Sequence, residues 1–167
     1  MTTKKELKWD LKDVVEEGKF EQLYSKVETG LKKYSEYRKE LNPNMGKEKF
    51  KEILEFSEQF KEKLSRLSAY TSLILATNIK SQDARVFQSK LDNLSIKISE
   101  QTMFLSHWIK GLDVEGLKKL DDENAPRLFN SIPDLSYSLF HSREAAKHTL
   151  SEKEEQLIHK KDTNGIE

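Results

Sequence analysis

The stretch FKEILEFSEQFKEKLSRLSAYTSLI, from Phe50 to Ile74, decides the fold. Mostly apolar residues recur in it at alternating steps of three and four, which is the spacing of a heptad seam on one side of a helix. Two of these positions are polar, in the series Phe50, Ile53, Ser57, Phe60, Leu64, Leu67, Thr71 and Ile74. The sequence therefore predicts a long helix over about residues 46–78.

A second segment with the same spacing follows directly. Its apolar positions are Phe87, Leu91, Leu94, Ile98, Leu105 and Trp108. Ser81 is a suitable cap for this helix, because its hydroxyl can accept a hydrogen bond from a backbone N–H of the first turn. We therefore predict a helix over about 81–109 that folds back on the first as a long antiparallel hairpin. Apolar residues outside both seams predict further packing partners: Phe56, Tyr70, Leu73, Ile96 and Met103.

The flanking segments also read as helices. Apolar residues from Phe20 to Leu41 predict a helix over about 18–41, after an irregular start at 1–17, and Asn42-Pro43-Asn44 ends it. Shorter helices are expected over about 113–124, 132–146 and 151–163. The last of these opens with Ser151 and Glu154 at the spacing of a capping box and should stop at Asn164-Gly165.

Composition agrees with an all-α fold, a helical hairpin or bundle that forms one domain over 1–167. Hydrophobic and charged residues each make up 35% of the 167 residues, a balance typical of long helices that bury one stripe. The 29 basic and 29 acidic residues cancel, which argues against nucleic acid as a partner. No segment has the apolar length of a membrane span or the pattern of a signal peptide, and cysteine is absent. We expect a soluble, cytoplasmic protein without membrane contact.

The residues that could carry chemistry do not form a recognisable motif. None of the four histidines has H-E-x-x-H spacing, and His141 and His148 could share a face only on an unbroken helix. The carboxylate pairs lie in charged stretches where nothing would raise their pKa values: Glu16-Glu17, Asp121-Asp122 and Glu154-Glu155. We therefore predict no catalytic, cofactor-binding or metal-binding residue in this chain, and no activity of the chain alone.

One aromatic cluster has two interpretations. Phe129, Tyr137 and Phe140, near His141 and Arg143, could line a peptide groove, because aromatic side chains with a few polar groups make good recognition surfaces. Their helical spacing favours core packing instead. From the residues alone, the sequence predicts a helical interaction module.

Both ends of the chain resemble a known family. Trp9-Asp10-Leu11 looks like the W-D-L motif of the oligoendopeptidase F family of zinc peptidases, in the thimet oligopeptidase-like superfamily. The segment from His148 to Leu157 resembles the family stretch H-x-L-S-x-x-E-E-x-L, and Asn164-Gly165 resembles its continuation. Between them, the segment from Tyr70 to Asn78, followed by Asp83, is similar to the family's long helices.

The resemblance implies that this chain corresponds to the amino-terminal part of a larger, two-lobed peptidase. In such a parent enzyme, the zinc bound by H-E-x-x-H and a downstream glutamate would lie beyond Glu167, in the remaining catalytic domain. Short peptides would be substrates of the full enzyme only, and the long helices would wall its channel. Without the catalytic domain, the apolar surface that it would cover stays exposed, and this surface would favour self-association of the chain. The alternative is a standalone helical module for protein–protein interaction.

Overall fold

The computed structural model describes residues 10–16, 18–114 and 116–164. Within these ranges every regular element is helical and no strand occurs, so the predicted all-α class is confirmed. The three long helices are α1 (Phe20–Tyr37), α2 (Lys47–Thr77) and α3 (Gln82–Ile109). Three shorter ones follow, α4 (Asn124–Phe129), α5 (Pro133–Glu144) and α6 (Glu152–Asn164), with a 3-10 turn, η1 (Ala145–His148), before α6.

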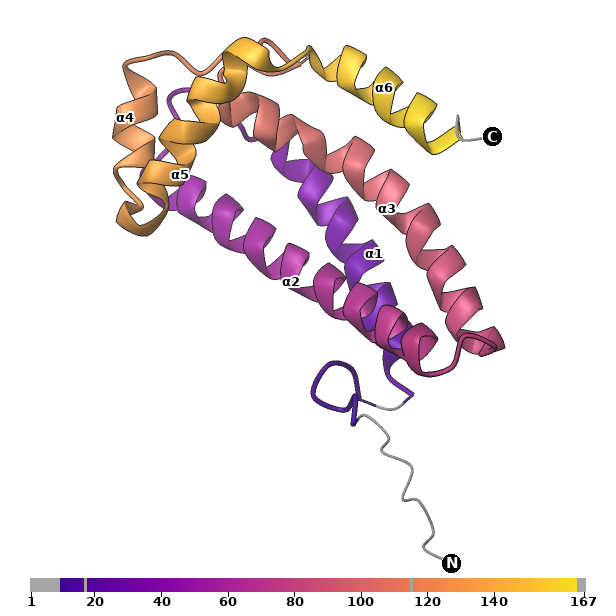
Figure 1. Ribbon diagram of the computed structural model, residues 1–167. Helices are drawn as coiled ribbons and strands as arrows, with labels where there is room; N and C mark the ends of the chain where they lie inside the picture. Colours follow the sequence, from indigo (N-terminus) through magenta and orange to yellow (C-terminus); the bar gives the residue numbers. More distant parts are fainter. Residues whose placement is uncertain (1–9, 17, 115, 165–167) are drawn as a thin grey trace, which may run out of the picture.

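The three long helices pack side by side as one body (Figure 1). Helices α2 and α3 form the expected antiparallel hairpin, and α1 lies along both of them. Phe20 of α1 stacks on Phe87 of α3, with ring centroids 3.9 Å apart. Tyr34 of α1 meets Phe60 of α2 edge to face at 5.5 Å. The apolar residues of α2 therefore contact both α1 and α3, which explains why they extend beyond one stripe.

Close packing of α1 on α2 depends on a glycine. A Cβ placed on Gly30 would lie 3.1 Å from the Phe60 ring, tighter than ordinary van der Waals contact. The two polar seam positions of α2 are buried, and each makes one hydrogen bond. Ser57 shares a 2.9 Å hydrogen bond with the Tyr34 hydroxyl, and Thr71 donates to the Leu67 carbonyl of its own helix at 3.0 Å. Each polar side chain of the seam thus has a hydrogen-bond partner in the core.

The helix predicted over 113–124 is wrong. The described residues of 113–123 form an irregular segment whose buried side chains Val114, Leu117 and Leu120 pack onto the core. Gly116 has a φ of +78°, a left-handed conformation that interrupts a right-handed helix. The Asp121 carboxylate accepts a 2.8 Å hydrogen bond from the Asn124 N–H, so Asp121 precedes the start of α4. Asn124, which was predicted to be the last residue of a helix, is instead the first residue of α4.

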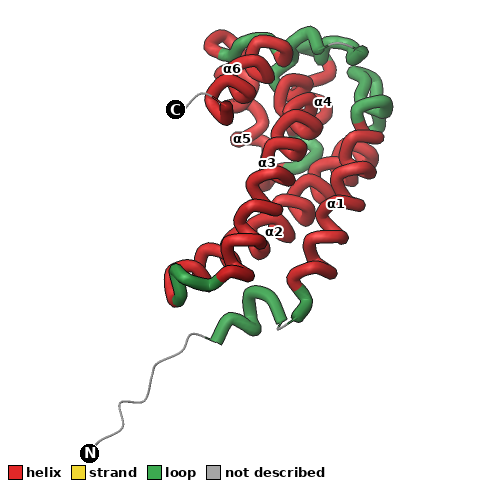
Figure 2. Tube along the Cα trace, turned by 90° about the vertical axis from the view of Figure 1, so that its right-hand side faces the viewer, coloured by secondary structure: helices red, strands yellow, loops and turns green. Residues whose placement is uncertain are grey.

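The C-terminal elements are arranged around one end of the body (Figures 1 and 2). Phe129 of α4 stacks on Phe50 of α2 at 6.1 Å, and Phe140 of α5 meets Phe129 edge to face at 5.2 Å. The predicted helix 132–146 ends earlier, because α5 stops at Glu144 and η1 follows. Helix α6 then lies along α3. Among the described residues, no helix combines the length and the apolar character needed to cross a membrane.

Candidate functional site

The histidines lie in separate elements. His107 is fully buried in α3, whereas the His141 side chain on α5 is 72% exposed and stacks on Tyr137. His148 is exposed in η1, and the break after α5 separates it from His141. The described part of the chain contains no group of three or more His, Cys, Asp or Glu side chains placed to hold a metal ion.

One carboxylate of each predicted pair has a hydrogen-bond partner that lowers its pKa. A hydrogen bond from the Asn124 backbone lowers the pKa of Asp121, and the Ser151 hydroxyl lowers the pKa of Glu154. A hydrogen bond from Lys19 likewise lowers the pKa of Glu16. Glu17 lies outside the described residues. None of these shifts prepares a general acid near neutral pH.

The aromatic cluster divides between core and surface. Phe129 is fully buried and Phe140 is half-buried against it, as the core interpretation predicts. Tyr137 is 82% exposed and faces outward beside His141. These three aromatic side chains therefore do not line one groove.

Helix α6 begins with the predicted capping box. The Ser151 hydroxyl and backbone N–H both donate to the Glu154 carboxylate, at 2.7 and 2.9 Å. The Glu154 N–H reaches back to the Ser151 hydroxyl at 3.4 Å. The reciprocal bonds satisfy N–H groups that the first turn of a helix leaves without partners, and they fix where α6 starts.

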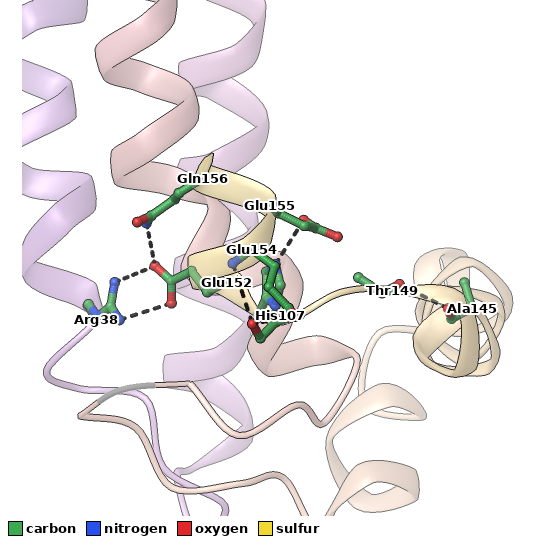
Figure 3. A network of polar contacts seen from close by, with 9 residues as sticks. Arg38, His107, Ala145, Thr149, Glu152, Glu154, Glu155 and Gln156 are labelled. Atoms are coloured by element: carbon green, nitrogen blue, oxygen red, sulfur yellow. Dashed lines mark hydrogen bonds and ion pairs between the residues drawn. The ribbon is translucent and has the colours of Figure 1, made fainter. Parts of the chain in front are cut away.

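An ion pair anchors the first turn of α6 to Arg38, the residue directly after α1 (Figure 3). The Arg38 guanidinium donates in parallel to both carboxylate oxygens of Glu152, with Nη1–Oε1 at 2.8 Å and Nη2–Oε2 at 3.0 Å. Glu152 also accepts from Gln156 at 3.1 Å, and it is buried, at 7% exposed. The two-pronged geometry sets the orientation of α6 as well as its position.

A second polar contact joins α6 to α3 (Figure 3). His107 Nε2 lies 2.9 Å from a carboxylate oxygen of Glu155. An ionised carboxylate only accepts hydrogen bonds, so the imidazole carries a proton on Nε2. The other ring nitrogen, Nδ1, is buried without a hydrogen-bond partner among the described residues. Glu155 therefore provides the polar contact of a fully buried histidine.

The face that α6 turns to the bundle is polar, and apolar side chains lie outside that face. Glu152, Glu155, Gln156 and His159 follow one another at helical spacing, and all four are buried or half-buried. Two apolar residues of the same helix face solvent, with Leu157 at 68% and Ile158 at 47% exposed. A surface helix of a globular protein ordinarily shows the reverse arrangement. We call Leu157 and Ile158 the outer α6 surface.

Sequence reasoning missed the anchoring contacts because their partners are far apart. Arg38 and Glu152 are separated by 114 positions, and His107 and Glu155 by 48. A local signal existed in the polar residues of α6 at helical spacing, with Leu157 and Ile158 outside that row. That pattern marks an unusual helix, but it does not identify Arg38 or His107 as partners.

A cleft of about 770 Å³ adjoins the anchoring contacts. Arg38, Lys118 and Lys153 line it together with Asp113 and Glu152, so charges of both signs meet there. A cleft with mixed charge selects no single class of ligand.

The structure thus combines three long packed helices with a C-terminal helix that separate polar contacts hold in place. An oligoendopeptidase F homolog of Borreliella burgdorferi is 26% identical to the chain over 155 residues. The match covers 90% of this chain and 24% of that protein, so the chain spans about a quarter of the length of this curated relative. No protein-family profile matches the chain. No solved structure matches it either.

Proposed function

We propose that this chain is the amino-terminal helical region of an oligoendopeptidase F-like zinc peptidase that hydrolyses short peptides. The observation that carries the proposal is the similarity to an oligoendopeptidase F homolog, which extends over 90% of this chain and only 24% of that protein. The W-D-L and H-x-L-S motifs near the two ends of the chain agree with it. Zinc and the catalytic residues belong, in this proposal, to the remainder of the longer protein.

The proposed role of the three-helix body is steric. A wall that admits short peptides and excludes folded proteins needs rigidity, and it needs no reactive group. Aromatic contacts among α1, α2 and α3 support such rigidity, since Tyr34 packs edge to face with both Phe60 and Phe104. Tightly packed interiors transmit force with little deformation, which suits a channel wall.

The outer α6 surface is evidence for a partner that covers the side of α6 turned away from the bundle. Leu157 and Ile158 are exposed on a helix whose other side is already fixed to the bundle by Arg38 and His107. Burying two such side chains would contribute about 1.5 to 3 kcal/mol each. We propose that the remaining catalytic domain covers this surface in the longer protein.

The test is a peptidase assay with quenched fluorescent peptides and added zinc. We expect the longer translation product to hydrolyse them in a zinc-dependent manner, and the 167-residue chain to show no turnover. Chelation followed by zinc replacement serves as the control for metal dependence. Zinc-dependent turnover by the 167-residue chain would contradict the proposal, as would a longer product that folds, binds zinc and leaves every peptide intact.

The alternative is a standalone helical interaction module. The exposed positions Tyr137 and Leu157 favour it, because large apolar side chains on a surface are typical of binding sites. The two functions differ in what covers the outer α6 surface. In the longer protein, Leu157 is protected by its own chain, whereas in a standalone module it stays exposed until a separate partner binds.

A further inference from the structure

A groove between α2, α3 and α5 is lined mainly by hydroxyl-bearing and apolar side chains. It encloses about 420 Å³, within the range of small-ligand sites, roughly 300 to 1,000 Å³. Half of its lining side chains carry hydroxyl groups, and most of the others are apolar. Its lining contains a lysine and no carboxylate. Such a surface offers hydrogen bonds, apolar contact and one positive charge within a single hollow.

Two buried hydroxyls lie at the α1–α2 side of the groove. Tyr34 and Ser57 are 3% and 5% exposed, both line the groove, and one 2.9 Å hydrogen bond joins them. Each hydroxyl has one proton. The single bond between them uses one of these protons, and the second proton has no acceptor in that bond. Neither hydroxyl has a further partner among the described residues. Burial raises the pKa of Tyr34, so its hydroxyl stays protonated at neutral pH and can donate.

The leftover proton is a reason to expect a ligand with an acceptor. A buried donor without a partner costs about 1 to 3 kcal/mol, and a carbonyl oxygen in the groove would relieve that cost. Farther along, Ser99, Ser106 and Ser138 line the groove with hydroxyls that have no partner within the described structure. Hydroxyls from α1, α2, α3 and α5 therefore all line the groove.

We propose that this groove binds a short peptide in extended form. Its backbone amides would bond to the hydroxyls, and an apolar side chain would pack against Met103, Leu135 and Leu139. Its carboxylate, at the C-terminus or on an acidic side chain, would lie at Lys61. The inference deepens the proposed function, because it names where a peptide would touch this helical region.

The distribution of polar groups favours a peptide over a fatty acid. A fatty acid would also place a carboxylate at Lys61, but its hydrocarbon chain would leave the hydroxyls facing an apolar tail. A peptide has an amide every 3.3 to 3.6 Å of extended chain, roughly. It can therefore match several hydroxyls at once.

Fluorescence anisotropy with a labelled tetrapeptide of alanine and leucine tests the proposal. We expect saturable binding that weakens about threefold in Lys61→Gln, the effect of one exposed charge contact. Lys47→Gln, an exposed lysine at the start of α2 and outside the groove, is the matched control and should bind like the wild type. The same peptide with an amidated C-terminus should bind the wild type as weakly as the free acid binds Lys61→Gln.

A blocking variant and NMR locate the site. Ser106 is exposed at the groove, so Ser106→Tyr should fill it without disturbing the core, and peptide binding should be lost. Amide shifts induced by the peptide should fall on residues of α2, α3 and α5. Equal affinity in Ser106→Tyr, shifts confined to other helices, or no saturation would overturn the proposal. Octanoate that binds more tightly than the peptide and displaces it would also overturn it.

The outcomes for the groove and for the proposed function are separable. If the longer product hydrolyses peptides while the 167-residue chain fails to bind the tetrapeptide, the groove assignment fails and the proposed function stands. If the chain binds the tetrapeptide and the longer product has no peptidase activity, the groove stands and the proposed function fails.

Discussion

The three-helix body and helix α6 are held by different forces. In the body, apolar side chains at helical spacing meet across α1, α2 and α3, and Phe50, Leu67 and Leu94 are almost entirely buried. At α6, the residues facing the bundle are polar, and an ion pair to Arg38 and a hydrogen bond to His107 set its position. The body depends on buried area, whereas α6 depends on directional contacts.

This difference predicts unequal stability. Burial of one large apolar side chain contributes about 1.5 to 3 kcal/mol, and the body repeats this many times. Helix α6 is held by a few polar contacts, each worth about as much as one buried side chain, so their sum is much smaller. We therefore expect α6 to detach from the body without unfolding it.

The largest expected effect is a charge placed in the body. Leu94 is 2% exposed, so Leu94→Asp buries an unpaired carboxylate at a cost of several kcal/mol, comparable to the stability of a whole domain. Circular dichroism should show loss of helix or a large fall in melting temperature. The matched control, Leu157→Asp, introduces the same charge at a 68% exposed position and should keep the fold. An unchanged melting temperature in Leu94→Asp would mean that the body is not held by this seam.

A smaller and local effect is expected at the anchor of α6. Glu152→Ala removes the acceptor of a two-pronged ion pair, and hydrogen bonds to charged groups are worth about 1.5 to 3 kcal/mol. Amide hydrogen exchange should speed up in α6 while α2 and α3 keep their protection. Asp162→Asn, an exposed change on the same helix, should leave exchange unchanged. Equal loss of protection in α2 and α6 would show that the two regions unfold together.

A still smaller effect concerns association between copies of the chain. The outer α6 surface should cause weak self-association that sedimentation velocity detects as a mass increasing with concentration. Replacing Leu157 and Ile158 by serine should abolish it, because the variant has no apolar side chains there to bury. A strictly monomeric wild type at high concentration would argue against a large uncovered interface.

The smallest effect concerns the capping box. Ser151→Ala removes hydroxyl bonds at the start of α6 and should cost about 1 kcal/mol of helix stability. The Ser151 hydroxyl holds the pKa of Glu154 below its usual value of about 4.3, so this contribution is present above that pH. It is lost as the pH falls through the lower pKa of the folded state. NMR titration should show the Glu154 pKa rising in Ser151→Ala, and an unchanged pKa would count against the capping contact.

The body was predictable from the sequence because its pattern is local. Steps of three and four residues reveal the buried stripes of α1, α2 and α3, and Ser81 accepts from the Ala84 N–H as predicted for a cap. The segment 113–123 was not predictable in this way. Its apolar residues have helical spacing, yet Gly116 is left-handed, and the Asp121 carboxylate accepts from the N–H of Asn124, the first residue of α4, so the helix starts later.

The anchoring contacts and the groove required the structure. The sequence contains His107 and Glu155, but only packing of α6 on α3 brings the ring and the carboxylate within 2.9 Å. The pairing of Tyr34 with Ser57 likewise depends on how α1 lies on α2. Helical periodicity shows which side of a helix is buried, and it does not show which helix covers it.

The most direct test of the proposed identity is the coding DNA beyond the codon for Glu167. We predict an open reading frame that continues into a segment encoding H-E-x-x-H, which would assign zinc binding and catalysis to the remainder of the protein. A stop codon directly after Glu167 would contradict the account and favour a standalone helical interaction module.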